Sequence, residues 1–341
     1  MPCLKDSHLS AQDLSTSFCI GSVAIRNRVV LAPMSGVTDL PFRQLAWRFG
    51  AGLVVTEMVA SRELVGNRNE SWARLKGAGL RPHMVQLAGR DPHYMAEAAR
   101  IAAGQGAEII DINMGCPAKK VTSGACGSAL MREPDHALKI VESVVAASPV
   151  PVTLKMRLGW DENSLNAPYL ASRAEQAGVQ AVIVHGRTRM QFYEGKADWD
   201  AIRAVREVVS VPLIANGDVD TAEDCADILR RSGADAVMLG RACQGRPWHA
   251  GVLAGHTAPE AGMVPVLATE HYDAMLDFYG EGPGLRHARK HLGWYLDRAR
   301  VPVTDETRAA VMTSRDPAEV RALMTAALSA GANDESMKEA A

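Results

Sequence analysis

One short pattern repeats along most of this chain and limits its fold more than any other feature. Each repeat is a run of β-branched or aliphatic residues followed by a helical pattern of about 10 to 15 residues, which is typical of parallel βα units. The eight runs cover residues 28–34, 52–58, 83–89, 108–114, 152–158, 181–187, 211–218 and 236–242. Eight such units predict a (β/α)8 barrel, the TIM-barrel architecture, which usually takes about 250 residues.

A doubly wound parallel sheet is the alternative α/β fold. That fold normally carries a GxGxxG turn after its first strand, and the segment "LAPMSGVTD" at 31–39 lacks it. The segment "CIGSVAIRNRVV" at 19–30 instead predicts a short hairpin that covers the bottom of a barrel. The sequence therefore favours a barrel over residues 20–254.

The pattern changes after the barrel. The segment "GHTAPEAGMVPV" at 255–266 is typical of a linker, and residues 264–331 contain only helical periodicity. We therefore expect a C-terminal all-helical domain over residues 264–331. Residues 1–19 form an N-terminal segment, and the polar tail 332–341 is predicted to be disordered.

Composition narrows the class of protein. The chain has 341 residues, is 47% hydrophobic and carries a net charge of -2, so any nucleic-acid binding must come from a local basic patch. It has no run of about 20 apolar residues and no secretory signal at its start, which predicts a cytoplasmic protein without a membrane segment. The six cysteines lie apart and none has histidine neighbours at metal-ligand spacing, so we expect no metal site.

Polar or conformationally special residues follow the carboxyl end of every predicted strand. Catalytic groups of barrel enzymes lie at these ends, on the face that the βα loops build. The residues concerned are Pro33, Met34, Ser35, Glu57, Gln86, Asn113, Cys116, Lys155, Arg157, His185, Arg187, Asn216, Gly217, Asp218, Gly240 and Arg241. The sequence therefore predicts an active site at this face.

The last two strand ends indicate a phosphate site. Gly217 and Gly240 expose backbone N–H groups where such barrels bind phosphate, and Arg241 adds a guanidinium. The alternative is that the glycines only permit tight turns and that Arg241 is a surface charge.

The fifth strand places two cations on one side. Lys155 and Arg157 are two residues apart, so both face the barrel mouth, where an anion or an electron-rich group must offset their charge. A reduced flavin is such a group. Gln86 and His185 could hydrogen-bond the edge of the same ring, although a lone histidine is more often structural.

Cys116 lies on a loop above the same mouth, between Gly115 and Pro117. Pro117 restricts Cys116 to extended conformations. Nearby cations favour loss of the thiol proton, whereas burial opposes it. We expect a thiol that donates or accepts a proton; the alternative is a small buried hydrophobic residue.

Seven segments in order then identify a family resemblance. They are "LAPMSGVTDLPFR", "VQLAGRDP", "IDINMGCPAKKV", "VTLKMRLGW", "VIVHGRTRMQFYEGKADWDAI", "VPLIANGDV" and "DAVMLGRACQGRPW". Together they resemble the flavin-dependent tRNA-dihydrouridine synthases over roughly residues 20 to 300. The segment "RHARKHLGWYL" at 286–296 is similar to the helical domain of the bacterial B-type branch.

The resemblance implies a chemistry. A barrel would hold FMN, NADPH or NADH would reduce it, and hydride would pass to C6 of a uracil in the tRNA D-loop while Cys116 protonates C5. The FMN contacts then fall on Pro33, Met34, Ser35, Gln86, Lys155, Asn216, Gly217, Asp218, Gly240 and Arg241, while Asn113, Arg157 and His185 line the flavin or uracil pocket. The B-type likeness favours tRNA position 17.

A basic segment is expected to bind the tRNA. Residues 286–300 carry Arg286, Arg289, Lys290, Arg298 and Arg300 against a single acidic residue, interleaved with histidine, tryptophan and tyrosine. Phosphates and stacked bases bind that mixture, and Arg187 would extend it across the barrel mouth. The alternative is a solvated helix face with Trp294 in the core.

Two rival functions and one rival residue stay open. The first rival is an FMN barrel oxidoreductase that acts on a free pyrimidine or dihydroorotate, which would not need the basic helical domain. The second is an RNA-binding regulator without catalysis, which would lack flavin absorbance. Cys126 is a second thiol ten residues from Cys116, and we expect it to serve packing.

Overall fold

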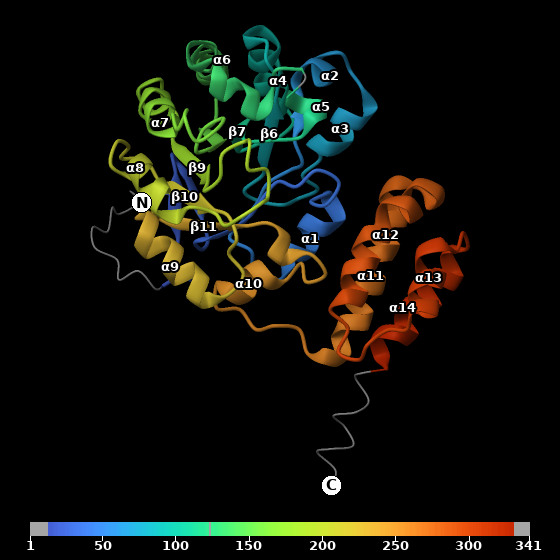
Figure 1. The fold of residues 1–341 in the computed structure, drawn as a ribbon. Coiled ribbons are helices and arrows are strands. Elements are labelled where there is room, and N and C mark those ends of the chain that lie inside the picture. The colour runs from blue at the N-terminus through green and yellow to red at the C-terminus, as the bar shows by residue number, and fades with distance from the viewer. Residues whose placement is uncertain (1–12, 123, 331–341) are drawn as a thin grey trace.

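Parallel strands curl into a barrel with helices around it (Figure 1). The computed structural model describes residues 13–122 and 124–330. The strands follow the order β4-β3-β11-β10-β9-β8-β7-β6-β5. Their bounds are β3 (Val29–Leu31), β4 (Leu53–Val54), β5 (Val59–Ala60), β6 (Met84–Ala88), β7 (Ile109–Met114), β8 (Val152–Arg157), β9 (Ala181–His185), β10 (Leu213–Asn216) and β11 (Ala236–Leu239).

The second predicted strand closes the barrel in two pieces. β4 pairs with β3, and β5 pairs with β6. A parallel bridge between Val55 and Met84 joins the two ends of the sheet, and Thr56 N–H donates to the Met84 carbonyl at 3.1 Å. The barrel is therefore confirmed, and the doubly wound alternative is wrong.

Helices form the outer layer. They are α1 (Leu40–Arg48), α2 (Ser61–Val65), α3 (Asn69–Leu75), α4 (Pro92–Gly104), α5 (Lys119–Thr122), η1 (Gly127–Arg132), α6 (Pro134–Ala147), α7 (Ala167–Gln176), α8 (Trp199–Arg206), α9 (Ala222–Ser232), η2 (Arg241–Cys243) and α10 (His249–Leu253). In α9 the sequence sets both ends: Thr221 and Asp224 form a capping box, and Gly233 ends the helix at φ 68°.

An apolar floor fills the lower half of the barrel. The hairpin of β1 (Phe18–Ile20) and β2 (Val23–Ile25) is antiparallel, as predicted. Its Ile20 and Ile25 are fully buried and pack with Ile109, Ile183 and Ile214 from the strands. The bottom of the barrel is thus closed by hydrocarbon, and polar chemistry is left to the upper end.

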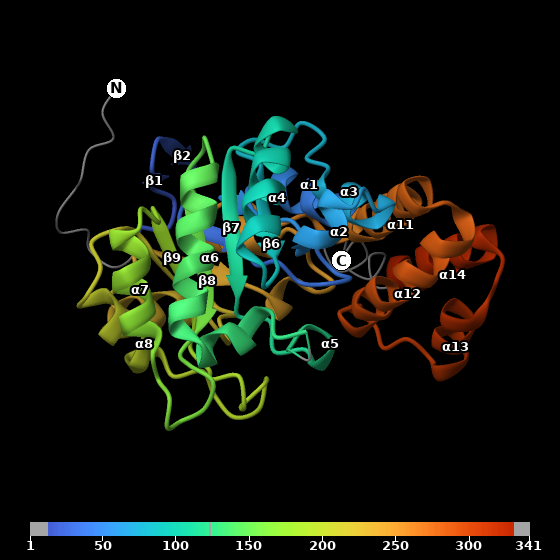
Figure 2. The same ribbon diagram turned by 90° about the horizontal axis from the view of Figure 1, so that it is seen from above.

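The C-terminal region is all-helical, as predicted, and lies beside the barrel in both views (Figures 1 and 2). Its elements are η3 (Ala261–Met263), α11 (Val264–Tyr279), α12 (Glu281–Asp297), α13 (Asp305–Thr313) and α14 (Pro317–Ser329). Residues such as Leu267, Met275, Leu292 and Met324 give it a core of its own. The predicted tail 332–341 and residues 1–12 of the N-terminal segment lie outside the described residues. No helix in the described part of the chain has the length and apolar character needed to cross a membrane.

Helix α1 carries the junction between the two regions. Phe42 packs against the rings of His271 and His291, with centroids 5.7 and 5.6 Å away. Asp39 caps α1 by accepting from Phe42 N–H at 3.0 Å, and it also accepts from the Tyr279 hydroxyl at 3.2 Å. Burial raises the pKa of the Asp39 carboxyl to about 6.

We predict that Asp39→Asn stabilises the protein at alkaline pH. A raised folded pKa means that ionised Asp39 costs free energy, so wild type loses stability as pH rises from about 4 past 6. Asparagine keeps the cap and a partner for Tyr279 without the charge. The free energy of unfolding, from urea titrations, should favour the variant by about 2 kcal/mol more at about pH 8 than at about pH 4. An equal difference at both pH values would contradict this assignment.

Candidate active site

Strand register brings the predicted side chains to one edge of the barrel. Asn113 of β7 is level with Lys155 of β8. Arg157 of β8 is level with His185 of β9, and His185 is level with Asn216 of β10. Residues paired in register on neighbouring parallel strands face the same side of the sheet, so these side chains share one side of the barrel wall. Lys155 confirms this convergence across the barrel, because its ammonium donates to Asn216 Oδ1 at 3.3 Å.

The backbone of the Cys116 loop is held from three sides. Asn113 Oδ1 accepts from Gly115 N–H at 3.2 Å and from Cys116 N–H at 3.0 Å. The Cys116 carbonyl accepts from Ser128, through its N–H at 3.1 Å and its hydroxyl at 2.9 Å. Arg157 Nε donates to the Gly115 carbonyl at 2.9 Å. The partly exposed thiol therefore sits on a fixed backbone at the barrel mouth.

Asp111 and Thr153 extend this network downward, and sequence reasoning missed both. Gln86 Nε2 donates to Asp111 Oδ2 at 2.7 Å, and Thr153 Oγ1 donates to Asp111 Oδ1 at 2.6 Å. Asp111 is fully buried, and burial raises its pKa. A signal was present: Asp111 interrupts an apolar strand and lies two residues before Asn113, hence on the same face.

Lys155 and His185 are basic side chains that each keep a hydrogen-bond donor for a ligand after their bonds to the protein. Burial lowers the pKa of the Lys155 ammonium, and no carboxylate lies within 4.0 Å of it in residues 13–122 and 124–330. Burial, together with the charges of Arg157 and Lys155, holds the pKa of His185 well below its usual range. The imidazole is therefore neutral. Arg187 Nη1 donates to its Nε2 at 3.4 Å, so Nδ1 carries the proton and is the donor left for a ligand.

Arg157 and Arg187 are committed to the protein. Both are 1% exposed. Arg157 Nη1 donates to the carbonyls of Thr188 and Phe192 at 2.7 and 2.8 Å. Arg187 donates to the carbonyls of Glu194 and Gly195 at 3.0 and 2.7 Å and forms a two-point pair with Asp218. These guanidiniums shape the loop after β9, and their predicted contacts with a ligand or RNA stay predictions.

Asp218 gathers two cations at the predicted phosphate end. It accepts from Arg187 at 2.9 and 2.5 Å and from Arg241 at 3.0 Å. Burial would raise the pKa of its carboxyl, but the hydrogen bonds from Arg187 and Ala197 outweigh burial and hold the pKa below its ordinary value. Gly217 has φ 127°, and a Cβ there would lie 2.8 Å from a His185 ring carbon, so the turn requires glycine. Arg241 remains 55% exposed and can reach a ligand.

The loop after β3 meets the helical region. Pro33 and Met34 are partly buried and Ser35 is exposed. Gly36 N–H donates to Glu57 Oε1. A Cβ on Gly36 would lie 2.6 Å from the Lys290 ammonium nitrogen, so α12 reaches this loop directly. A Cβ on Gly240 would lie 3.5 Å from Met34 Sδ, which places the first and last strand ends side by side.

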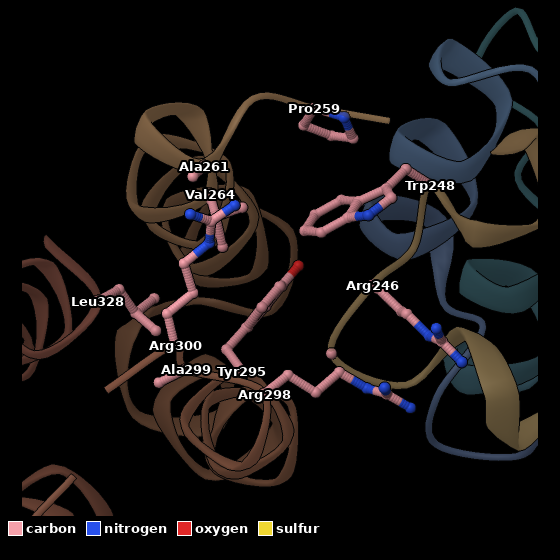
Figure 3. Close-up of a pocket in the computed structure, with 11 residues that line it drawn as sticks. Arg246, Trp248, Pro259, Ala261, Val264, Tyr295, Arg298, Ala299, Arg300 and Leu328 are labelled. Carbon is pink, nitrogen blue, oxygen red and sulfur yellow. The ribbon is translucent and has the colours of Figure 1, made fainter. Parts of the chain in front are cut away.

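The predicted basic segment does not form one face. Arg286 is exposed, whereas Arg289 donates to the carbonyls of Thr313 and Ser314 at 3.4 and 3.2 Å. Arg298 and Arg300 instead line a cavity of about 270 Å³ between the barrel and the helices, together with Arg246, Trp248 and Tyr295 (Figure 3). Trp294 is partly buried against the barrel core, as the alternative expected.

Two further observations concern Cys126 and metal ligands. Cys126 Sγ donates to the Gly124 carbonyl at 3.3 Å, and burial raises the pKa of its thiol, which suits packing. Within the part of the chain that the structure describes, no three histidine, cysteine, aspartate or glutamate residues are grouped as metal ligands.

The free groups of the mouth fit a flavin mononucleotide. Lys155 has donors left over after its bond to Asn216, which suits the electron-rich edge of the ring. Arg241 is exposed beside two glycine turns, which suits a phosphate. The walls supply Met34, a polarizable side chain that packs well against a ring.

Comparisons with known proteins agree with this geometry. A family model described as dihydrouridine synthase matches residues 30–332. The chain is 71% identical to "Probable tRNA-dihydrouridine synthase" of Rhizobium leguminosarum bv. phaseoli, over 92% of this chain and 98% of that protein. It is 48% identical to tRNA-dihydrouridine synthase B of Pseudomonas syringae pv. tomato, over 85% and 88%.

A solved structure supports the barrel. Histamine dehydrogenase from Rhizobium sp. 4-9 aligns with a TM-score of 0.55 at 13% identity, covering 77% of this chain and 51% of that chain. At this identity the likeness concerns the fold alone.

We predict that Asp218→Asn destabilises the protein by about 3 kcal/mol, because it leaves the buried Arg187 charge without its counter-charge. Since the Asp218 pKa is lowered in the folded state, its contribution is present above about pH 4 and is lost as pH falls further. Urea unfolding at neutral pH measures the effect. In a double-mutant cycle, Arg187→Met should reduce the added cost of Asp218→Asn; full additivity would contradict the pairing.

Proposed function

The chain belongs to the dihydrouridine synthase family, and we propose that it reduces uridine in tRNA to dihydrouridine, with FMN as cofactor and NAD(P)H as reductant. Its similarity to tRNA-dihydrouridine synthase B places it with the B-type branch. The observation that carries the proposal is a thiol on a fixed backbone, above a barrel mouth that presents free cationic and neutral donors.

FMN is proposed to lie across the strand ends, held by the residues predicted from the sequence. Lys155 and Gln86 would face the ring, with Pro33, Met34 and Ser35 against it. Asn216, Gly217, Gly240 and Arg241 would hold the phosphate side. Asp218 would act through Arg241 and not by contact with FMN, because its carboxylate already binds Arg187 and orients Arg241. When bound, FMN carries the electrons of NAD(P)H to the substrate as a hydride at C6 of uracil.

Cys116 is proposed to deliver the proton to C5. Reduction of the C5–C6 bond adds one hydride and one proton, so uridine, NAD(P)H and one proton give dihydrouridine and NAD(P)⁺. A proton donor must stand within hydrogen-bond reach of the carbon it protonates. Anchors on both the N–H and the carbonyl of Cys116 leave only side-chain rotation to place the thiol. Solvent then returns a proton to the sulfur.

Neutral His185 and the second N–H of the Asn113 amide are proposed to recognise the uracil. The rest of that amide binds Gln86 and the Cys116 loop. The uracil ring offers carbonyl acceptors, and the Nδ1–H of the neutral imidazole can donate to one of them. Because the target lies within folded RNA, the base must turn out of its stack to reach the mouth. The pocket thereby selects a flexible loop, for which the B-type likeness favours D-loop position 17.

The tRNA is proposed to bridge the barrel mouth and the helical region. Arg286 is exposed on α12, and Lys290 of the same helix stands beside the loop after β3. The arginines that line the interdomain cavity add positive charge along the same junction. A tRNA substrate would place the protein in the cytoplasm.

We predict that Cys116→Ala lowers dihydrouridine formation in vitro by about 100-fold or more, because proton transfer loses its donor. Flavin absorbance and its bleaching by NADPH should persist, since the thiol is not needed for either. The matched control is Cys126→Ala, in the same loop region, which should retain activity. Loss of activity in Cys126→Ala with retention in Cys116→Ala would make Cys126 the donor.

We predict that Arg286→Glu weakens tRNA binding by about tenfold at about 0.1 M salt, with a smaller ratio at higher salt, because it reverses a charge near phosphates. Arg173→Glu, on exposed α7 of the outer barrel, is the matched control and should bind normally. Filter binding of unmodified tRNA measures both. Equal affinity in the two variants would refute the assignment of α12 to the tRNA surface, and flavin content should not change in either.

A further inference from the structure

We propose that Asp111 is a positioning residue, which sets the direction of a buried hydrogen-bond chain that ends on the Cys116 loop. This inference deepens the proposed function, because it concerns the loop of the proposed proton donor. Asp111 lies at the bottom of the polar layer, on the strand that leads to that loop. Asp111 is 0% exposed, so it is not itself presented to a ligand at the mouth.

The hydrogen-bond chain runs through two side-chain amides. Gln86 Nε2 donates to Asp111 Oδ2 at 2.7 Å, and Gln86 Oε1 accepts from Asn113 Nδ2 at 2.7 Å. Asn113 Oδ1 then accepts from the N–H groups of Gly115 and Cys116 at 3.2 and 3.0 Å. All three side chains are buried, so water does not replace a lost partner cheaply.

The direction of this hydrogen-bond chain follows from the groups at its two ends, the Asp111 carboxylate and the N–H groups of the loop. An ionised carboxylate can only accept, so Gln86 must turn its NH₂ group toward Asp111. Gln86 then presents oxygen to Asn113, and Asn113 presents oxygen to the loop. Backbone N–H groups can only donate, which agrees with that outcome. If Asn113 turned over, its NH₂ group would face the N–H groups of the loop, and Cys116 would lose its anchor. If Gln86 turned over, its NH₂ group would face that of Asn113, which favours a turn of Asn113 as well.

Burial of the Asp111 carboxylate costs free energy, which indicates that its hydrogen bonds have a role. Lower in the barrel, inward positions such as Ile109 and Ile183 are apolar and fully buried. An apolar residue in place of Asp111 would avoid the desolvation that raises its pKa. Thr153 Oγ1 also donates to Asp111 at 2.6 Å, so each carboxylate oxygen of Asp111 accepts a hydrogen bond from a neighbouring side chain.

The experiment compares Gln86→Glu with the double variant Gln86→Glu/Asp111→Asn. In the single variant two carboxylates face each other, and they stay in contact only while they share a proton. Once that proton is lost, their repulsion moves the carboxylate at position 86 out of reach of Asn113. In the double variant the new amide at position 111 donates to the new carboxylate at position 86. That carboxylate still accepts from Asn113, so the direction is kept at any pH. Both variants carry the same substitution at position 86, so any direct effect of it on flavin binding is common to them.

The readout is the alkylation rate of Cys116 in the holoenzyme, followed by peptide mass spectrometry with iodoacetamide. The rate ratio of single to double variant should be near one at about pH 6 and rise several-fold by about pH 9, as the shared proton is lost. A ratio that stays constant with pH would overturn the proposal.

A second variant keeps the test decisive if a carboxylate at position 86 prevents folding. Gln86→Met preserves the shape but removes both hydrogen bonds of the middle link. It should raise the alkylation rate of Cys116 several-fold over wild type, and an unchanged rate would overturn the proposal. Alkylation requires neither tRNA nor turnover, so a failure of the proposed reaction would leave this readout intact. Dihydrouridine formation, measured in parallel, reports on that reaction separately.

Discussion

Polar groups buried inside a closed barrel need partners, and this constraint organises the whole mouth. Hydrocarbon fills the lower half, so unpaired polar atoms above it would each cost about 1 to 3 kcal/mol. Asp111, Gln86 and Asn113 satisfy one another, and the last acceptor in their chain holds the Cys116 loop. The rigidity of the proposed donor therefore comes from the same hydrogen bonds that make a polar interior tolerable.

The cations of the mouth divide by the same logic. Arg157 and Arg187 donate to loop carbonyls and to Asp218, so they stabilise the loop after β9 at the side of the mouth. Lys155 and Arg241 keep donors that point outward to a ligand. A flavin with its phosphate requires that division: fixed walls that exclude water, and a few charges free to meet negative charge as it develops. The helical region adds Lys290 beside the loop after β3, so the proposed tRNA surface and the proposed cofactor loop adjoin.

Much of this could be predicted from the sequence, because strand ends converge in any closed barrel. The eight units, the bottom hairpin and the convergence of Lys155 with Asn216 follow from periodicity alone. Asp111 was missed because it lies within β7, one layer below the strand ends where catalytic residues are expected. The tasks of Arg157 and Arg187 depend on loop carbonyls such as Thr188 and Gly195, whose positions no local pattern specifies. The basic segment 286–300 likewise runs along α12 and past its end at Asp297, so its charges point to different surroundings.

The residues at the barrel mouth are proposed to reduce a uridine of tRNA. The most direct measurement is position-resolved mapping of dihydrouridine in tRNA from cells with and without this gene. We expect loss at one D-loop position, favouring position 17, and its recovery when the gene is returned. Unchanged dihydrouridine at every position would contradict the proposed function.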